Sequence, residues 1–286
     1  MKKKSLNMSK VVFISDFFVE QILGGGELND FECYSLLTER GFTTYRINSH
    51  LMTTDDLEHN SIYVISNFIN LNQNVKNKLA EYKYIIYEHD HKYIKNRNPA
   101  SFVDFKAPNA MLVNIDFYKN AKAVLCQSEF HLNIVHKNTR LDNLINLSGN
   151  LWSTKSLDFM SSVCDKEKTD TFAVLDSKIA HKNTIGCINY CLSKGGDYNL
   201  ISDNNYFSFL TKLGENKKFV FIPKTPETLS RVCVEARMMN MSVIVNDLVG
   251  ASKESWFSLK GKELIQFMFS KRQTIVDTLL DIINEE

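Results

Sequence analysis

Two glutamates eight positions apart, Glu227 and Glu235, lie within the segment Pro226–Val245. A proline, a carboxylate and a threonine are typical of the start of a helix, and the later aliphatic run is typical of a buried strand. We therefore predict a helix over residues 227–240 and a strand over residues 242–245. A helical rise of about 1.5 Å per residue would separate the two carboxylates by roughly 12 Å along the axis. One extended ligand can contact both carboxylates.

The start of this predicted helix also favours an anion. The backbone N–H groups of Thr228, Leu229 and Ser230 would have no partner inside the helix, and the helix dipole places partial positive charge beside them. A nucleotide-sugar has a matching layout, with sugar hydroxyls at one end, a diphosphate in the middle and a ribose diol at the other end. The alternative on spacing alone is an ordinary amphipathic helix, because acidic residues are common in a first helical turn.

Two further clusters follow predicted strands. Gly24, Gly25 and Gly26 come after a strand at residues 11–14, and glycines let a backbone approach a ligand closely. A plain turn is the alternative. The run Glu88-His89-Asp90-His91 follows a strand at 84–87, at the edge of the sheet where open parallel folds bind ligands.

In this second cluster, His89 could orient a hydroxyl group and Asp90 could accept a proton. The alternatives are structural capping and a metal site. A metal site is disfavoured because no further cluster supplies the remaining ligands. At the end of the next strand, Ser128 is predicted to cap a helix.

Basic and aromatic residues alternate after this cluster. Lys92, Lys95, Arg97 and Lys106 are interleaved with Tyr93, Phe102 and Phe105. Such a mixture can hold phosphates and stack on a base, so His91, Lys92, Lys95 and Arg97 are predicted to bind the acceptor. An ordinary polar loop is the alternative.

The elements that must position these residues alternate between short strands and helices. Strands are predicted at 11–14, 43–47, 62–66, 84–87, 123–126, 171–175, 198–201, 218–222 and 242–245, and helices at 28–39, 183–193, 205–213, 227–240 and 262–286. This alternation indicates an α/β fold with two mostly parallel sheets covered on both faces. We predict an N-terminal domain at 1–160, a second domain at 161–262, and a C-terminal helix at 263–286.

Composition excludes several classes of protein. The formal net charge is +1, so nothing global indicates a nucleic-acid or membrane partner. The six cysteines lack zinc-ligand spacing, which predicts free buried thiols in a reducing compartment. No run approaches the roughly 20 apolar residues of a membrane span, and no apolar signal core follows the first lysines. We therefore expect a cytoplasmic protein.

The segment 227–236 resembles the E-x7-E motif of retaining glycosyltransferases with the GT-B fold, including the pair Glu235-Ala236. The resemblance implies two Rossmann-like domains facing a cleft, with the last helix packing back on the first domain. It also implies that Glu227 meets the transferred sugar and Glu235 the nucleotide ribose. Gly24–Glu27 resembles the family's Gly-Gly-x-Glu loop, and His89-Asp90 resembles a pair that the family carries at this strand end.

The chain departs from the family in two places. Thr228–Ser230 stands where the family has glycine, a bulky aromatic residue and glycine. In the second domain the family uses an arginine and a lysine to hold the departing diphosphate, whose growing charge fixed cations stabilise. Lys182 matches the lysine, but Ser177 stands in the arginine position, so Lys178 is the expected substitute. The alternative is that both lysines are solvated surface residues.

The short length and the segment 88–99 resemble small bacteriophage glycosyltransferases that modify DNA. This implies a UDP-sugar donor, such as UDP-arabinose or UDP-glucose, and 5-hydroxymethylcytosine in DNA as the acceptor, in the host cytoplasm if the protein is phage-encoded. It further implies retention of configuration without a covalent intermediate, a cofactor or a metal. The alternatives are transfer to a surface polysaccharide or lipid-linked glycan, and a non-catalytic scaffold that binds a nucleotide. The oligomeric state is not predicted.

Overall fold

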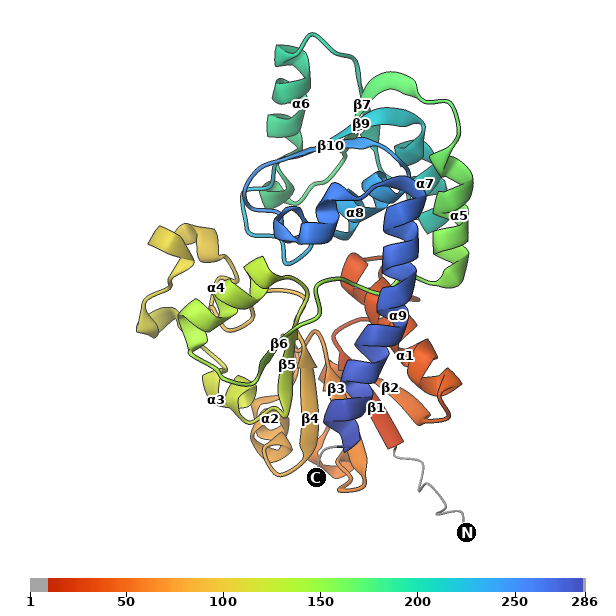
Figure 1. Ribbon diagram of the computed structural model, residues 1–286. Coiled ribbons are helices and arrows are strands. Elements are labelled where there is room, and N and C mark those ends of the chain that lie inside the picture. The colour runs from red at the N-terminus through yellow and green to blue at the C-terminus, as the bar shows by residue number, and fades with distance from the viewer. Residues whose placement is uncertain (1–9, 285–286) are drawn as a thin grey trace.

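A computed structural model describes residues 10–284, which form two parallel β-sheets flanked by helices (Figure 1). The first sheet has six strands in the order β2-β1-β3-β4-β5-β6, and the second has four in the order β10-β9-β7-β8. The alternation of strands and helices therefore predicted the α/β class correctly.

Apart from its largely exposed edge strand β2, the first sheet is apolar on both faces because alternate residues of the other strands enter different cores. Its strands are β1 (Lys10–Ser15), β2 (Thr43–Asn48), β3 (Ser61–Ile65), β4 (Lys83–Tyr87), β5 (Ala123–Cys126) and β6 (Leu144–Asn146). Its helices are α1 (Gly25–Glu39), α2 (Gln73–Leu79), α3 (Ile115–Lys119) and α4 (Glu129–Thr139). Val12 and Ile14 pack in the core with α2, α3 and α4, whereas Val11 and Phe13 pack with α1 and the C-terminal helix. Burial on both faces explains why these strands read as continuous apolar runs.

The second sheet is smaller and is built in the same way. Its strands are β7 (Thr169–Leu175), β8 (Tyr198–Ile201), β9 (Asn216–Phe221) and β10 (Ser242–Val245). Its helices are α5 (Thr154–Cys164), α6 (Thr184–Ser193), α7 (Tyr206–Gly214) and α8 (Arg231–Met238). Short 3₁₀ turns lie at 49–51, 54–56, 99–101, 103–105, 109–111, 180–182, 250–253 and 255–258.

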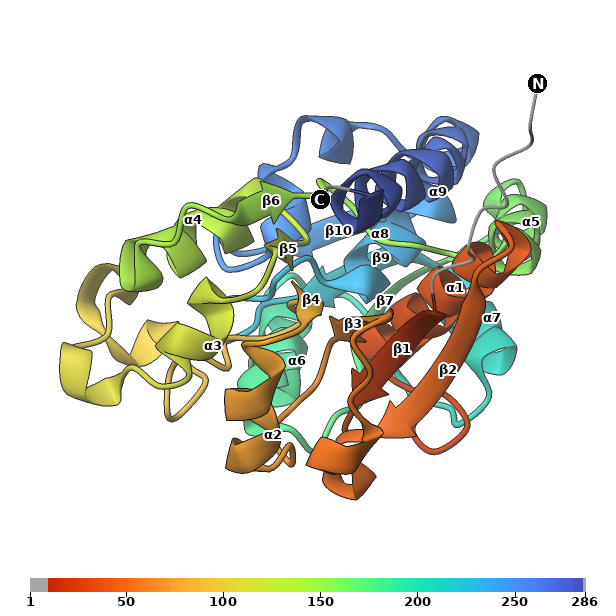
Figure 2. The same ribbon diagram turned by 90° about the horizontal axis from the view of Figure 1, so that it is seen from below.

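The last helix, α9 (Gly261–Asn284), joins the two domains (Figures 1 and 2). Its first half places Leu264 and Met268 in the core of the second domain. Its second half places Ile275 and Leu279 in the core of the first. The prediction that this helix packs back on the first domain is confirmed.

The predicted domain boundary at residue 160 falls inside α5. This helix packs against α7, α8 and α9, and its residues Leu157 and Met160 lie in the core of the second domain. We therefore propose that the chain crosses between the domains at residues 147–153, before α5.

The sequence predicted nine of the ten strands within a few residues, and the short strand β6 was missed. Two helix starts differ from prediction. Helix α1 begins at Gly25 rather than Leu28, and α8 begins at Arg231 rather than Glu227. All six cysteines are buried with free thiols, as predicted. None of the helices between residues 10 and 284 combines the length and apolar character needed to cross a bilayer.

Candidate functional site

Two adjoining cavities lie between the domains, beside the carboxyl ends of strands from both sheets. The first has a volume of about 460 Å³ and the second about 470 Å³. Residues that line both are Gly26, His89, Lys182, Glu227 and Thr228. These five residues come from both domains and form a wall that the two cavities share. A ligand in one cavity would therefore lie next to a ligand in the other.

Glu235 is held in the first cavity by three donors. Its Oε1 atom accepts hydrogen bonds from Trp152 Nε1 at 3.0 Å, from Tyr206 Oη at 2.6 Å and from Arg231 Nε at 2.9 Å. Burial and the adjacent Glu235 carboxylate raise the pKa of Tyr206, so its hydroxyl stays protonated and donates. All three donors reach Oε1, which leaves Oε2 for a ligand in the cavity.

The sequence predicted that Glu227 starts a helix, but in the structure the helix α8 begins only at Arg231. Its N–H donates to the Leu248 carbonyl at 2.8 Å, and its carbonyl accepts from Gly250 N–H at 3.0 Å. Glu227 therefore forms an isolated parallel bridge with Val249, residues 228–229 bend, and Ser230 turns into α8 with a φ of 71°. Glu227, Thr228 and Ser230 line the first cavity, but the Leu229 side chain is buried in the core of the second domain. The prediction for Leu229 concerned its backbone N–H group, so the burial of its side chain leaves the contact with a donor as a prediction.

Gly25 and Gly26 are the first two residues of α1, not a loop before it. A Cβ atom at Gly26 would lie 3.3 Å from the His89 ring, so glycine lets α1 approach this histidine closely. The starts of α1 and α8 both face the first cavity. Two sets of unpaired N–H groups with aligned dipoles favour an anion between them.

Lys182 and Glu227 form an ion pair in the shared wall. Lys182 Nζ lies 2.8 Å and 2.9 Å from the two carboxylate oxygens, and about a quarter of its side chain is exposed. Lys178, in contrast, is exposed and lines neither cavity. The structure thus brings only one of the two predicted lysines to the site.

His89 pairs with Asp30, not with its sequence neighbour Asp90. Its Nε2 lies 2.6 Å from Asp30 Oδ1, and its Nδ1 lies 2.7 Å from Gln127 Nε2. The Gln127 amide also donates to the Glu88 carbonyl at 3.0 Å, which fixes its orientation and makes Nδ1 an acceptor. The Nε2 proton therefore faces Asp30. With both ring nitrogens engaged, His89 shapes the shared wall and leaves no nitrogen for a substrate proton.

Asp90 lies in the second cavity and pairs with Arg97, whose Nη1 is 3.0 Å from Asp90 Oδ2. Burial would raise the pKa of Asp90, but the charges of Lys92, His91 and Arg97 outweigh it and hold the pKa below the usual value. Nearby, burial raises the pKa of Glu27, which accepts a hydrogen bond from Asn67 at 3.3 Å.

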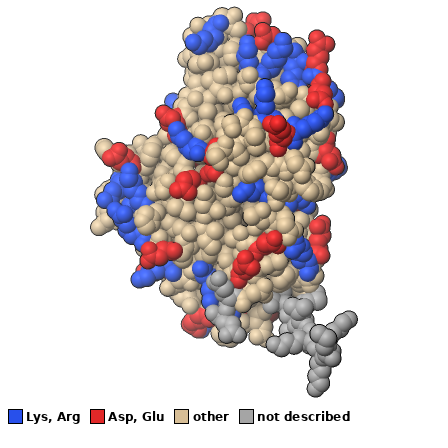
Figure 3. All heavy atoms as spheres, in the orientation of Figure 1, with Lys and Arg blue, Asp and Glu red and all other residues tan. Residues whose placement is uncertain are grey.

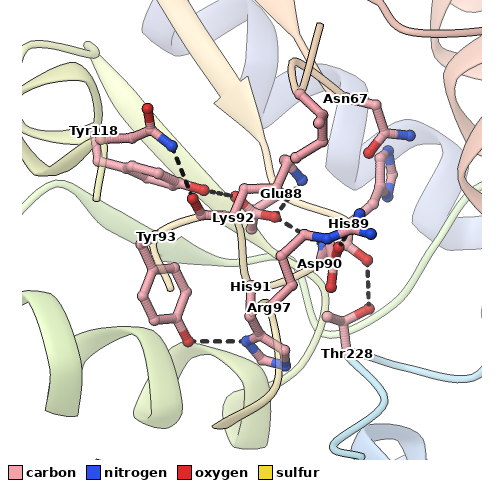
Figure 4. Close-up of polar contacts among 12 residues, drawn as sticks. Asn67, Glu88, His89, Asp90, His91, Lys92, Tyr93, Arg97, Tyr118 and Thr228 are labelled. Atoms are coloured by element: carbon pink, nitrogen blue, oxygen red, sulfur yellow. Dashed lines mark hydrogen bonds and ion pairs between the residues drawn. The ribbon is translucent and has the colours of Figure 1, made fainter. Parts of the chain in front are cut away.

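Two residues predicted to bind the acceptor are instead buried beneath this cavity (Figure 4). Lys92 Nζ lies 2.5 Å from Glu88 Oε1, and both side chains are fully buried. His91 Nε2 donates to the Pro226 carbonyl at 3.3 Å, so its Nδ1 accepts from the Tyr93 hydroxyl at 2.8 Å. Neither can reach a bound ligand. Lys95 is exposed but lines neither cavity. Of the four residues predicted to bind the acceptor, Arg97 alone lines a cavity, the second one.

Histidines 91 and 131 make stability depend on pH. Burial lowers the pKa of His91 and lowers that of His131 well below the ordinary value of 6.5. The unfolded chain therefore binds these protons more readily than the folded chain, and stability is lost as the pH falls below about 6.5. Because the pKa of His131 is lowered further than that of His91, we expect His131 to contribute more to this loss.

We expect thermal unfolding to shift down between pH 7.5 and pH 5.5, and His131→Asn to reduce that shift. An asparagine oxygen can still accept the Gln127 N–H that now reaches His131 Nδ1 at 3.2 Å. An unchanged pH dependence in His131→Asn would show that this ring does not contribute to it.

Sequence analysis missed most of the remaining cavity residues. The first cavity also contains Asp176, Asp203, Tyr206 and Arg231, and the second contains Glu27, Asn67, Asn96, Asn98 and His181. Glu27, Asn96 and Asn98 lie in segments whose resemblance to the family had been noted without assigning them a role. Arg231 also had a readable signal, since it precedes Glu235 by four positions, the spacing of an ion pair on a helix. The predicted cap at Ser128 is confirmed, because its Oγ accepts from His131 N–H at 3.1 Å. No group of three His, Cys, Asp or Glu side chains between residues 10 and 284 is placed to hold a metal ion.

No family profile matches the sequence, and no curated protein matches it either. Solved structures do match along the whole chain. Anabaena HepE in complex with UDP and glucose has a TM-score of 0.59 at 11% identity, over 95% of this chain and 99% of that one. A glycosyltransferase from Rickettsia africae has a TM-score of 0.50 at 13% identity, over 98% and 100%. The chain has the GT-B fold.

A third structure shares this GT-B fold. It is an alpha-glucosyltransferase in complex with UDP and a 13-mer DNA, with a TM-score of 0.50 at 8% identity, over 93% of this chain and 89% of that one. At such identities the likeness concerns the fold. The roles of individual residues in the two cavities rest on their geometry.

Proposed function

We propose that this protein is a glycosyltransferase that moves a sugar from a nucleotide-sugar to a hydroxyl acceptor. The observation that carries the proposal is the pair of adjoining cavities with the Lys182–Glu227 ion pair in their common wall. The first cavity would hold the donor, and the second the acceptor. HepE and the alpha-glucosyltransferase, which share the fold, were both crystallised with UDP, which supports a UDP-sugar such as UDP-glucose or UDP-arabinose.

In the proposed reaction, the bond from the anomeric carbon to the diphosphate breaks, and a bond to the acceptor oxygen forms on the same face. The acceptor proton passes to the departing diphosphate oxygen, so configuration is retained and no covalent intermediate with the protein is required. Lys182 and the starts of α1 and α8 supply positive charge as the diphosphate leaves. Because the chain itself supplies this charge, the scheme uses neither a metal nor a cofactor.

Glu235 is proposed to bind the ribose diol through Oε2. Glu235→Gln keeps an acceptor for its three donors but removes the charge, and charge-assisted hydrogen bonds are about twice as strong as neutral ones. We expect the affinity for UDP, measured by calorimetry, to fall roughly tenfold. The matched control is 2′,3′-dideoxyuridine diphosphate, which lacks the diol. Equal losses for both ligands would place the ribose elsewhere.

The proposed acceptor is 5-hydroxymethylcytosine in DNA, and the proposed place of action is the cytoplasm, where free thiols persist. Exposed basic residues of the first domain support a polyanion: Arg97, which lines the second cavity, Lys95 and Lys106 in the segment 95–112, and Lys137 and Arg140 at the end of α4. Figure 3 shows Lys and Arg side chains gathered over this part of the first domain. Such a surface would hold the phosphates beside the acceptor cavity.

A second acceptor class is favoured by the lining of the second cavity. Asn67, Asn96, Asn98, Asp90 and Arg97 supply donors and acceptors, and within the described chain no Phe, Tyr or Trp lines this cavity. A base turned out of DNA usually stacks on aromatic or apolar side chains. A hydroxyl-rich glycan, as in a surface polysaccharide or lipid-linked acceptor, needs only the polar groups.

The test is to incubate the protein with radiolabelled UDP-sugars and three acceptors: hydroxymethylated DNA, unmodified DNA, and a glycan or lipid-linked glycan mixture. Label in hydroxymethylated DNA alone supports the first acceptor. Label in the glycan fraction alone rejects it in favour of the second. If the protein neither transfers nor hydrolyses any nucleotide-sugar, the enzyme proposal is rejected and a nucleotide-binding scaffold remains.

A further inference from the structure

The donor cavity needs a second cation, and the residue expected to supply it lies elsewhere. Four acidic side chains line the first cavity, namely Asp176, Asp203, Glu227 and Glu235, against two basic ones, Lys182 and Arg231. A diphosphate adds further negative charge. Lys178 is exposed and lines neither cavity, and Ser177 has no charge. We propose that Arg231 binds the diphosphate of the donor, an inference that rests on the proposed function.

Arg231 lies where the two helix starts converge. It is the first residue of α8, its side chain is only 8% exposed, and it lines the first cavity. A Cβ atom at Gly25 would lie 3.5 Å from the Cβ and Cδ atoms of Arg231, so the start of α1 packs directly against this side chain. The guanidinium thus shares the cavity with the N–H groups that favour an anion.

Its guanidinium is oriented before any ligand binds. The Nε atom donates to Glu235 Oε1 at 2.9 Å, and Nη1 donates to the Leu151 carbonyl at 2.6 Å. The guanidinium also stacks 4.3 Å above the Trp152 ring. Within residues 10–284 these two hydrogen bonds use Nε and Nη1 but not Nη2, and the Tyr206 hydroxyl lies close to the same guanidinium. A planar guanidinium held in this way can offer a fixed N–H group to a phosphate oxygen at little entropic cost.

The competing explanation is that Arg231 only positions Glu235 and the interdomain segment 151–152. That role predicts an equal loss of affinity for a nucleoside and for its diphosphate, because both carry the ribose. A direct phosphate contact predicts a loss confined to the diphosphate. The ratio of the two dissociation constants therefore separates the explanations even if Arg231 also supports Glu235.

The experiment measures uridine and UDP binding by calorimetry to the wild-type protein, Arg231→Gln, Arg231→Lys and Lys178→Gln. Arg231→Gln should weaken UDP relative to uridine by roughly 10- to 100-fold, the range of a hydrogen bond to a charged group. The UDP-to-uridine affinity ratio of Arg231→Lys should fall between those of the wild type and Arg231→Gln, because lysine keeps the charge and loses the planar geometry. Lys178→Gln should leave the ratio unchanged.

Arg237→Gln is the matched control for folding. Arg237 lies on the same helix, and its guanidinium bonds the Leu259 and Ser258 carbonyls outside the cavity. Equal losses for uridine and UDP in Arg231→Gln, or a ratio reduced by Lys178→Gln instead, would overturn the inference. If the wild-type protein binds none of the nucleoside diphosphates, the proposed function fails first and the inference with it.

Discussion

Replacing Lys182 by methionine is expected to lower kcat for sugar transfer by roughly 10²- to 10³-fold, the usual effect of removing one preorganised group that stabilises transition-state charge. Lys182 Nζ bonds both Glu227 oxygens and lies 5.6 Å over the Phe221 ring, so its position is fixed before the donor binds. Methionine has a similar length and no charge. Transfer of radiolabelled sugar under saturating donor measures the effect.

Lys178→Met is the control for this substitution, since the residue lies four positions away, is exposed and lines neither cavity. Glu227→Gln removes the other half of the same ion pair and should lower kcat with little change in UDP affinity. Because the two residues act as a unit, the double variant should be less impaired than the product of the single effects. Wild-type turnover in Lys182→Met would remove this lysine from the reaction.

Nine of the ten strands were predictable because burial on both faces of a parallel sheet leaves a local trace. Val11–Ile14 and Ile62–Ile65 read as unbroken apolar runs bounded by polar residues, whereas the short helices α2 and α3 and the helix α5 were not predicted. The β6 strand was not predictable in this way. It has only three residues, all half-buried, so its apolar signal is short.

The start of α8 was mispredicted because a contact distant in sequence overrides the local signals. Pro226, Glu227 and Thr228 form a typical helix start, but the Glu227 backbone instead pairs with the segment 248–250. That pairing moves the helix start to Arg231. It also places an arginine, rather than the acidic Glu227, at the helix start that faces the first cavity. A sequence pattern cannot show which of two backbone partners Glu227 will take.

The functional site was only partly predictable for a related reason. The resemblance to glycosyltransferases with the E-x7-E motif pointed to Glu227, Glu235 and Lys182, all of which line the first cavity. The partner of His89 lies 59 positions away, at Asp30, and no local pattern connects them. The charge of a residue also does not show whether its side chain is buried. Lys92 and Arg97 lie in one basic stretch, yet Lys92 is fully buried and Arg97 is exposed.

This difference in depth leads to the largest expected effect on stability. Lys92→Met should lower the free energy of unfolding by roughly 3–5 kcal/mol, because it leaves a buried carboxylate without its cation. Glu88 also accepts hydrogen bonds from the Tyr118 hydroxyl and from Asp90 N–H, so it cannot turn to solvent. A loss of this size is a large part of the 5–15 kcal/mol typical of a folded domain. Urea denaturation of the wild type and the variant measures it.

Arg97→Met is the matched comparison, because Arg97 pairs with Asp90 while about half of its side chain is exposed. An exposed pair contributes at most about 1 kcal/mol, so this variant should unfold close to the wild type. In the double variant Glu88→Gln/Lys92→Met both buried charges are gone, and part of the stability should return. Similar losses in Lys92→Met and Arg97→Met would mean that Lys92 is not buried as the structure shows. A selective loss in Lys92→Met would instead show that the buried Lys92–Glu88 ion pair stabilises the fold, whereas the exposed Arg97–Asp90 pair does not.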